Sequence, residues 1–234
     1  IKTQDDGFPA NDLAAIGYHA VWHGQKGFNG VAILARGETP VEVQRGLAGD
    51  PEDEQARYLE VEVFGLRVAG IYLPNGNPVH TDKYAYKLRW LERLHAHADA
   101  LLKLEEMTVL AGDFNIIPTK ADLWKEGPWL DDALYQPAVR RAYQGLKNLG
   151  YTDAFEAHST FSGSPEDNRY TFWDYQAGAW PKNEGIRIDH HLLSPQAADR
   201  LADVVIHKDT RGRTHDEAKP SDHVPVVVEL TTKS

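Results

Sequence analysis

The stretch "MTVLAGDFNIIPT", residues 107–119, decides how the chain is organised. Its first half is apolar and of strand length, and Gly112, Asp113 and Asn115 come directly after it, with Pro118 behind them. A buried strand that ends in this way presents a carboxylate and a carboxamide at the edge of a sheet. Asp and Asn also favour ordinary turns, so these residues alone leave a plain turn and a functional site open.

Several other segments have the pattern of strands or helices. Residues 30–35, "GVAILA", form an apolar run of strand length, and residues 58–73, "YLEVEVFGLRVAGIYL", alternate around Phe64-Gly65 as in a hairpin with one face buried. Strands are also expected at 18–22, 186–193 and 224–230, and helices at 11–16, 81–105 and 138–149. This order predicts the α/β class: two mixed β-sheets packed as a sandwich with helices on the outer faces, a four-layer α/β sandwich.

The composition is that of a globular protein with one domain. The chain has 234 residues, of which 41% are hydrophobic, and no repeat or linker divides it, so we expect a single domain over residues 1–234. No apolar run reaches the roughly 18 residues of a membrane span. The absence of cysteine excludes disulfides and thiolate metal sites. The net charge of −10 argues against a general nucleic-acid coat protein, but a local basic patch or a bound cation permits contact with a short stretch of phosphate.

Compact polar residues stand at the ends of several of these segments. Because buried strands converge, such ends bring side chains together at one rim of a domain. The stretches concerned are 23–27 (HGQKG), 72–75 (YLPN), 112–115 (GDFN), 187–190 (RIDH) and 221–223 (SDH).

These side chains suit phosphodiester hydrolysis. The reaction needs a divalent metal on oxygen ligands, a base that activates water, and donors that hold the phosphoryl oxygens. Asp113 and Asp222 supply carboxylates. A histidine can act near neutral pH, which makes His223 a candidate, and Asp189 is a candidate to orient its ring by a hydrogen bond. The remaining donors are the amides of Asn75 and Asn115 and the hydroxyl of Tyr72.

Five motifs together resemble one known family. "GIYLPNG", "AGDFN", "TFWDY", "RIDHHLLS" and "KPSDHVPV" occur in the order found in exonuclease III-type apurinic/apyrimidinic endonucleases, which belong to the endonuclease/exonuclease/phosphatase superfamily. The early segment "GYHAVWHGQKGFNGVAIL" is similar to the same family. The resemblance covers nearly the whole chain. The Tyr-x-Pro-Asn and Thr-Phe-Trp stretches narrow it to the DNA-repair branch.

The resemblance implies a catalytic role at five positions. Asp113 would polarise or deprotonate the attacking water, and Asn115 would hold both Asp113 and the phosphate. His223, paired with Asp189, would contact the scissile phosphate and stabilise its charge. Tyr72 would bind phosphate or assist the leaving group.

The resemblance also implies substrate-binding and metal-binding positions. Asn75 would bind phosphate, and the loop of Gln25 and Lys26 would grip the DNA backbone. An apolar pocket for a flipped abasic sugar would be formed by Phe172, Trp173 and Ile188. Asp222 would lie at or near the metal, which we expect to be Mg²⁺, with Mn²⁺ as the alternative.

The N-terminus departs from the family pattern. Family members begin with a strand–helix–strand unit of roughly 30 residues whose final glutamate is the principal metal ligand. Here the chain opens with "IKTQDDGFP", which resembles the family's segment just after that glutamate, so we expect this ligand upstream of Ile1 and regard the domain as N-terminally incomplete. Three explanations are open: the sequence is a fragment, the strand–helix–strand unit exists but is not part of this sequence, or the protein lacks the unit. We favour the first two, because losing a central strand would expose sheet edges.

The sequence therefore predicts a DNA-repair hydrolase. We expect Mg²⁺-dependent incision 5′ to abasic sites, with 3′–5′ exonuclease and 3′-phosphatase activity, by a cytoplasmic monomer that binds double-stranded DNA at abasic sites or 3′ ends and has no membrane partner. Two alternatives stay open. One is a phosphodiesterase of the same superfamily that acts on a small phosphoester or a lipid head group. The other is a catalytically dead DNA-binding module, should the glutamate be absent from the protein.

Overall fold

The computed structural model describes residues 1–162, 169–214 and 219–232. None of the helices in this part of the chain is long and apolar enough to cross a membrane. In chain order the helices and strands are α1 (Ala10–Ala15), β1 (Tyr18–His23), β2 (Val31–Arg36), β3 (Val41–Arg45), β4 (Tyr58–Val63), β5 (Leu66–Tyr72), α2 (Asp82–Leu102), β6 (Thr108–Asp113), α3 (Pro137–Leu149), β7 (Thr152–Asp153), α4 (Ala154–Ser162), β8 (Asp189–Leu193), α5 (Pro195–Ala198), β9 (Leu201–Ile206) and β10 (Val226–Leu230).

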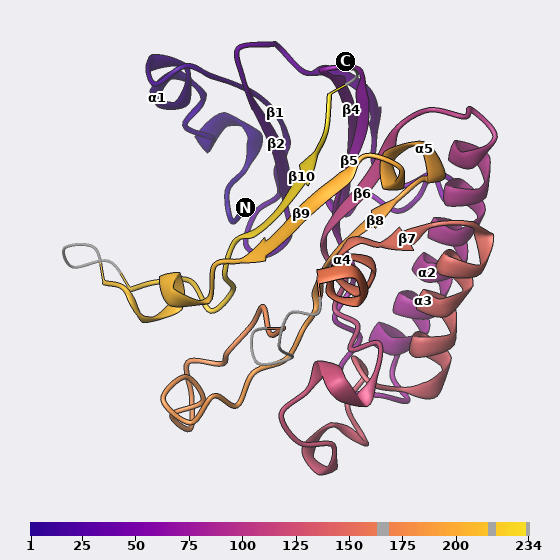
Figure 1. The fold of residues 1–234 in the computed structure, drawn as a ribbon, viewed down its shortest axis with the longest axis vertical. Helices are drawn as coiled ribbons and strands as arrows, with labels where there is room; N and C mark the ends of the chain where they lie inside the picture. The colour runs from indigo at the N-terminus through magenta and orange to yellow at the C-terminus, as the bar shows by residue number, and fades with distance from the viewer. Residues whose placement is uncertain (163–168, 215–218, 233–234) are drawn as a thin grey trace.

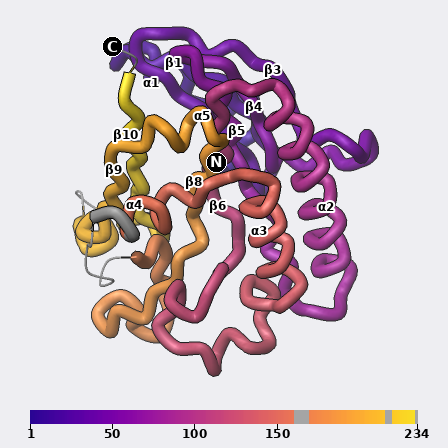
Figure 2. Tube along the Cα trace, turned by 45° about the vertical axis from the view of Figure 1, so that its right-hand side comes forward, coloured from indigo at the N-terminus to yellow at the C-terminus, as the bar shows by residue number. Residues whose placement is uncertain are grey.

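A six-stranded mixed sheet forms the centre of the molecule. Its strand order is β3-β4-β5-β6-β8-β7, in which β5 and β6 are parallel and the other neighbours antiparallel. Helices α2 and α3 lie side by side on its outer face (Figures 1 and 2). The main core lies between these helices and the sheet, and it includes Trp90, Leu94, Leu110, Phe114 and Tyr143.

Two antiparallel hairpins, β1–β2 and β9–β10, make the second layer. They pack on the opposite face of the six-stranded sheet, and α1 lies outside β1 (Figure 1). Two β-layers with helices outside them are the sandwich that the sequence predicts.

The strand pattern of residues 58–73 is correct, but its predicted burial is wrong for β4. Both faces of β4 are buried, because the hairpin β1–β2 covers one face and helix α2 the other. Glu60 is consequently inside the protein. Its carboxylate accepts hydrogen bonds from Tyr58 Oη and Arg67 Nη1, each at 2.6 Å, and His97 Nε2 lies 2.9 Å away. These partners compensate the cost of burying a charge.

Candidate active site

The strand register places three of the predicted residues in one row. Tyr72 lies opposite Asp113 in the β5–β6 pair, and Asp113 lies opposite Asp189 in the β6–β8 pair. Directly opposite residues of neighbouring strands point to the same side of a sheet and lie close together. Strand pairing therefore brings Tyr72, Asp113 and Asp189 together in one row, although they are far apart in sequence.

The chain turns sharply after Asp113. Oδ1 of Asp113 accepts a hydrogen bond from the backbone N–H of Asn115 at 2.8 Å, which is an Asx-turn. Asn115 takes a left-handed backbone with φ 47°, a conformation that Asn tolerates better than most residues. Gly112 has φ 141°, and a Cβ there would lie 2.0 Å from the carbonyl oxygen of Ile71. The motif Gly-Asp-Phe-Asn is thus required by backbone geometry as well as by chemistry.

The two site amides form a relay that ends at Asp113. Nδ2 of Asn75 donates to Oδ1 of Asn115 at 3.3 Å, and Nδ2 of Asn115 donates to Leu73 O at 2.9 Å and to Asp113 Oδ2 at 3.2 Å. An amide nitrogen carries two hydrogens, so both N–H groups of Asn115 are in use. In this arrangement Asn115 holds Asp113 as expected, but it has no N–H left for a phosphate. Asn75 is exposed and keeps one N–H for that purpose.

His223 reaches the same row from a different part of the chain. The segment around Phe172 pairs with Ile186 on one side and with His223 on the other. This pairing brings Nδ1 of His223 to 2.9 Å from Asp189 Oδ2, and Nε2 to 3.9 Å from Asp113 Oδ2. Burial alone would lower the pKa of His223, but the hydrogen bond and charge of Asp189 outweigh it and raise the pKa to about 9. His223 is therefore a cation at neutral pH.

The pKa of Asp113 is raised as well, which favours its neutral form. Burial, together with the negative charge of Asp189, raises the pKa of Asp113 to about 7. Burial and the charge of Asp113 also raise the pKa of Tyr72. A carboxyl that titrates near neutral pH is suited to accept a proton from water.

The described residues do not by themselves complete a metal site. Among them, no group of three or more His, Asp or Glu side chains comes together in the way that holds a metal ion. Asp222 is half-buried, and its charge acts on both His223 and Tyr72, which places it beside the row. A carboxylate oxygen there has the chemistry that Mg²⁺ prefers, so Asp222 fits as one ligand of a divalent cation.

The structure places the three residues predicted for an apolar pocket at different depths. Phe172 is half-buried and its ring lies edge-on to His223, with ring centres 5.0 Å apart, so it faces the site. Trp173 is fully buried and packs on Trp180. Ile188 is 3% exposed and lies in an inner cluster against Phe172. Trp173 packs beneath the site with Ile206 and Val224, so its predicted pocket contact is corrected. Ile188 packs against Phe172, and its contact with a bound sugar stays a prediction.

Of the two loop residues predicted to contact DNA, Gln25 is hydrogen-bonded within the protein and Lys26 is exposed. Oε1 of Gln25 accepts hydrogen bonds from Asn29 Nδ2 at 2.9 Å and from Ala56 N at 3.1 Å, so its amide oxygen secures the loop. Lys26 is exposed and free to meet a phosphate. The neighbour of Ala56 is Arg57, whose guanidinium lies over the ring of Tyr72 at 5.1 Å.

Two basic side chains at the site, Arg57 and Lys87, are not among the site residues that the sequence predicts. Arg57 contacts Tyr72 as just described, and it also donates to Tyr72 O at 3.1 Å. Lys87 is fully buried and donates to the carbonyls of Asn75 and Asn115. The signal for Lys87 is its place in α2, where it shares a face with Leu91 and Leu94 at helical spacing, an unusual position for a lysine.

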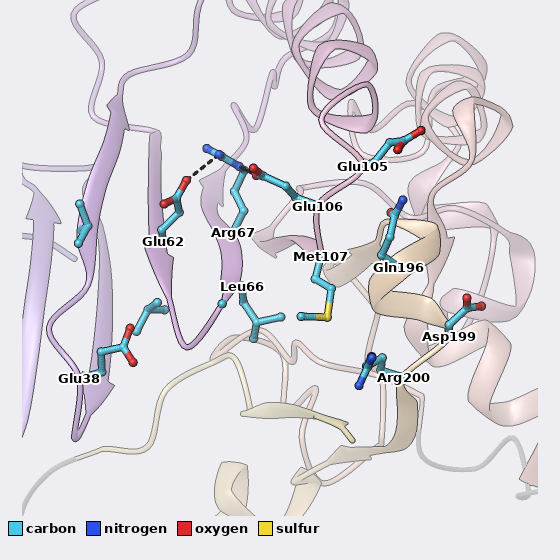
Figure 3. Close-up of a pocket in the computed structure, with 13 residues that line it drawn as sticks. Glu38, Glu62, Leu66, Arg67, Glu105, Glu106, Met107, Gln196, Asp199 and Arg200 are labelled. Atoms are coloured by element: carbon cyan, nitrogen blue, oxygen red, sulfur yellow. Dashed lines mark hydrogen bonds and ion pairs between the residues drawn. The ribbon is translucent and has the colours of Figure 1, made fainter. Parts of the chain in front are cut away.

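A hollow in the surface lies at the other end of strands β5 and β6. Its volume is about 720 Å³, and it is lined where β5 begins, at Leu66 and Arg67, and just before β6, at Met107. Arg67 lies there between Glu62 and Glu106, each 2.7 Å away (Figure 3). Because Tyr72 and Asp113 stand at the opposite strand ends, this hollow is separate from the row.

The fold and the row define a class of phosphoester hydrolase. The model of the endonuclease/exonuclease/phosphatase family matches residues 2–223, so the chain belongs to this family. Within it, the chain is a DNA-repair nuclease of the exonuclease III type that hydrolyses phosphodiester bonds.

The relatives agree over almost the whole chain. It is 32% identical to exodeoxyribonuclease III of Haemophilus influenzae, covering 98% of this chain and 87% of that enzyme. It is similar to an AP endonuclease from Archaeoglobus fulgidus, with 33% identity and a TM-score of 0.89 over 99% of this chain and 86% of that one. The 3′ phosphatase NExo from Neisseria, solved with a product DNA hairpin, matches with 35% identity and a TM-score of 0.89 over the same shares.

Proposed function

We propose that the protein is a divalent-metal-dependent nuclease that incises duplex DNA 5′ to abasic sites and trims 3′ ends as an exonuclease and phosphatase. The observation that carries the proposal is the row Tyr72–Asp113–Asp189 with His223 hydrogen-bonded to its last member. Asp113 and Tyr72 in the row and His223 beside it supply a base, a hydrogen-bond donor and a cation, which are groups that phosphodiester hydrolysis uses.

Each residue of the row has a distinct task in this proposal. Asp113 accepts a proton from the attacking water, and Asn115 keeps its carboxylate oriented through the hydrogen bond at 3.2 Å. His223 contributes a positive charge to the phosphate. Tyr72 and Asn75 donate to the phosphoryl or leaving oxygens. A divalent cation held in part by Asp222, Mg²⁺ or Mn²⁺, supplies charge neutralisation at the phosphate.

The substrate is double-stranded DNA with an abasic site or a processed 3′ end, bound by a monomer. Support comes from the names of the relatives, which include an AP endonuclease and a 3′ phosphatase with product DNA. The half-buried Phe172 beside His223 is the apolar surface against which an unstacked sugar packs.

The test is cleavage of a duplex oligonucleotide that carries one abasic site, with Mg²⁺ and with EDTA. The wild-type protein is expected to nick the abasic strand only with metal. Asp113→Asn and His223→Ala are each expected to lower the rate at least about 100-fold, the effect of losing a group that moves a proton or stabilises charge. Asp99→Asn, an exposed carboxylate paired with Lys103, is the matched control and should retain the wild-type rate.

The outcomes separate the proposed function from its alternatives. A wild-type rate in Asp113→Asn or His223→Ala would disprove the site. Metal-dependent hydrolysis of small phosphodiesters without any nicking of DNA would favour a different substrate, and binding of abasic duplex without cleavage in Mg²⁺ or Mn²⁺ would favour a DNA-binding module.

Phe172 distinguishes abasic-site incision from 3′-end activity. Phe172→Ala is expected to reduce incision at abasic sites at least tenfold more than release of 3′ phosphate, because only the first reaction packs an extruded sugar on the ring. Both rates are measured on duplexes of the same sequence. Equal losses would remove Phe172 from substrate recognition and leave it a packing role beside His223.

A further inference from the structure

Lys87 is a lysine without access to solvent. It lies in the first half of α2, where Trp90, Leu91 and Leu94 are also buried, and 0% of its surface is exposed. A lysine is almost never fully buried unless its amine has partners. The contacts of the Nζ atom therefore indicate why it is there.

The amine of Lys87 joins two strand-end loops. Nζ donates to the main-chain carbonyl of Asn75 at 3.0 Å and to that of Asn115 at 2.6 Å. Asn75 comes after β5 and Asn115 after β6, and both partners are carbonyls rather than carboxylates. One side chain thus connects the main chain of both site amides.

The loop after β5 also packs directly on the stem of Lys87. Gly76 has φ +86°, and a Cβ there would lie 2.6 Å from Cδ of Lys87, so only glycine allows this approach. Next to it, Nδ2 of Asn77 donates to both oxygens of Asp132 at 3.1 Å. The loop after β5 therefore contacts Lys87 twice: Asn75 O accepts a hydrogen bond from the amine, and Gly76 packs on the aliphatic stem.

The amine of Lys87 is able to link the two carbonyls in either protonation state. Burial lowers the pKa of Lys87 to about 7, against the opposing charges of Asp113 and Asp132. The ammonium form offers three N–H groups and the neutral amine two, so each carbonyl keeps a donor in either form. The connection between the loops persists when the amine loses its proton.

We propose that Lys87 is a positioning residue of the nuclease: by holding the main chain of Asn75 and Asn115 together, it sets the hydrogen bond between their amides and, through Asn115, the direction of the Asp113 carboxylate. Lys87 itself touches no substrate. The consequence for the reaction rests on the proposed function, whereas the geometry of the two amides does not.

The kinetic test compares three variants on the abasic duplex. Lys87→Met removes the donor but keeps the length and apolar stem, and it is expected to lower kcat at least tenfold while KM changes less than threefold, because a misdirected Asp113 affects the chemical step. Lys87→Arg keeps donors and is expected to recover kcat to within threefold of wild type. Lys83→Met, an exposed lysine one turn earlier in α2, should stay within twofold.

A kcat for Lys87→Met within twofold of wild type would overturn the proposal. Should Lys87→Met fail to fold, Lys87→Gln enters the same comparison, because its shorter amide keeps a donor without the reach to both carbonyls.

A double-mutant cycle separates positioning from general support of the fold. In an Asn115→Ala background the hydrogen-bonded route to Asp113 is already lost. At pH 8.5, where most of the Lys87 amine is neutral and its charge no longer acts on Asp113, adding Lys87→Met is expected to lower kcat less than threefold further. If the two losses multiply in full, Lys87 acts independently of Asn115 and the proposal is wrong.

A third measurement does not depend on any activity. The side-chain amide signals of Asn75 and Asn115 in ¹H–¹⁵N spectra are expected to move in Lys87→Met and to stay in place in Lys83→Met. If the wild-type protein cleaves no DNA, the proposed function fails, and these signals still decide the role of Lys87. Unchanged amide signals in Lys87→Met would overturn the proposal.

Discussion

Asp189 acts on the site through another residue. The two oxygens of the Asp189 carboxylate lie 2.9 and 3.1 Å from Nδ1 of His223, within hydrogen-bond distance. This carboxylate stabilises the imidazolium form of His223 and raises its pKa to about 9. The backbone N–H of Asp189 in turn donates to Oγ1 of Thr171 at 3.1 Å. The histidine is therefore charged because a fixed carboxylate stands beside it.

Asp189→Asn should change the pH profile of cleavage. The amide keeps a hydrogen-bond acceptor but loses the charge, so burial then lowers the pKa of His223 from about 9 toward its ordinary value of 6.5, while the charges of Asp113 and Asp222 still oppose burial. The same change removes a charge that raises the pKa of Asp113, which lowers the ratio of rates at high and low pH in the same direction. The imidazolium is lost at pH 8 but largely kept at pH 6, and the ratio of kcat/KM at pH 8 to that at pH 6 should fall at least about tenfold. The measurement is kcat/KM from pH 5.5 to 9; an unchanged profile would mean that the charge of His223 is not required.

Strand alternation gives β8 two different faces. Asp189 is half-buried in the row, whereas His190 points the other way, is 1% exposed and packs against Phe114 and Tyr143. His190 therefore has a structural role in the core. Nε2 of His190 lies 2.9 Å from Ile116 O and Nδ1 lies 3.1 Å from Arg187 Nη1, so both nitrogens are occupied in the neutral form.

The neutral His190 should make stability depend on pH. Burial, reinforced by the charge of Arg187, lowers the pKa of His190 to about 4 from 6.5. Between these values the unfolded chain binds a proton that the folded chain does not, so the free energy of unfolding decreases as pH falls. At about 1.4 kcal/mol per pH unit the loss from this group is about 3 kcal/mol between pH 7 and 4.

The contribution of His190 is measured by urea unfolding at both pH values. His190→Gln should be less stable at pH 7 but should lose about 3 kcal/mol less than wild type on acidification. His207→Gln, at an exposed position, is the control and should behave as wild type does. Parallel curves for His190→Gln and wild type would contradict the assignment.

The elements that the sequence predicts are those with a long or regular pattern. The helix expected at 81–105 is α2 at Asp82–Leu102, and the strand before Asp113 is β6. The pattern does not reveal β3, β7, β9, α4 or α5. Most of these are short, and the apolar side chains of β9 are buried by contacts with segments distant in sequence, including β6, β8 and α4.

The charge of the whole molecule and its substrate have the same sign. The net charge is −10, and DNA carries a dense row of phosphates. We therefore expect binding to depend on local cations such as the exposed Lys26, and on a bound metal ion, rather than on the overall field. Local contacts of this kind are screened by salt in proportion to the number of phosphates that they neutralise.

Affinity for abasic duplex should accordingly fall steeply with salt. We expect at least about a tenfold loss between 50 and 200 mM NaCl, measured by fluorescence anisotropy in EDTA. Lys26→Gln should reduce the slope of log K against log salt by about one, as for the loss of one phosphate contact. Lys103→Gln, whose amine is paired with Asp99, should leave the slope unchanged. A flat salt response would argue against phosphate-directed binding.

By itself the sequence determined the class of fold and the residues of the row. Apolar periodicity predicts the strands, and compact polar motifs at their ends make Asp113, Asp189 and His223 candidates, because these are local patterns. The order of the motifs, which resembles one family, favours a functional site over ordinary turns. Only the tertiary structure decided which side chains reach the site. It buries Trp173, commits both N–H groups of Asn115, and brings Lys87 under the two amides. Those outcomes depend on register and on packing between segments far apart in the chain, which no local pattern contains.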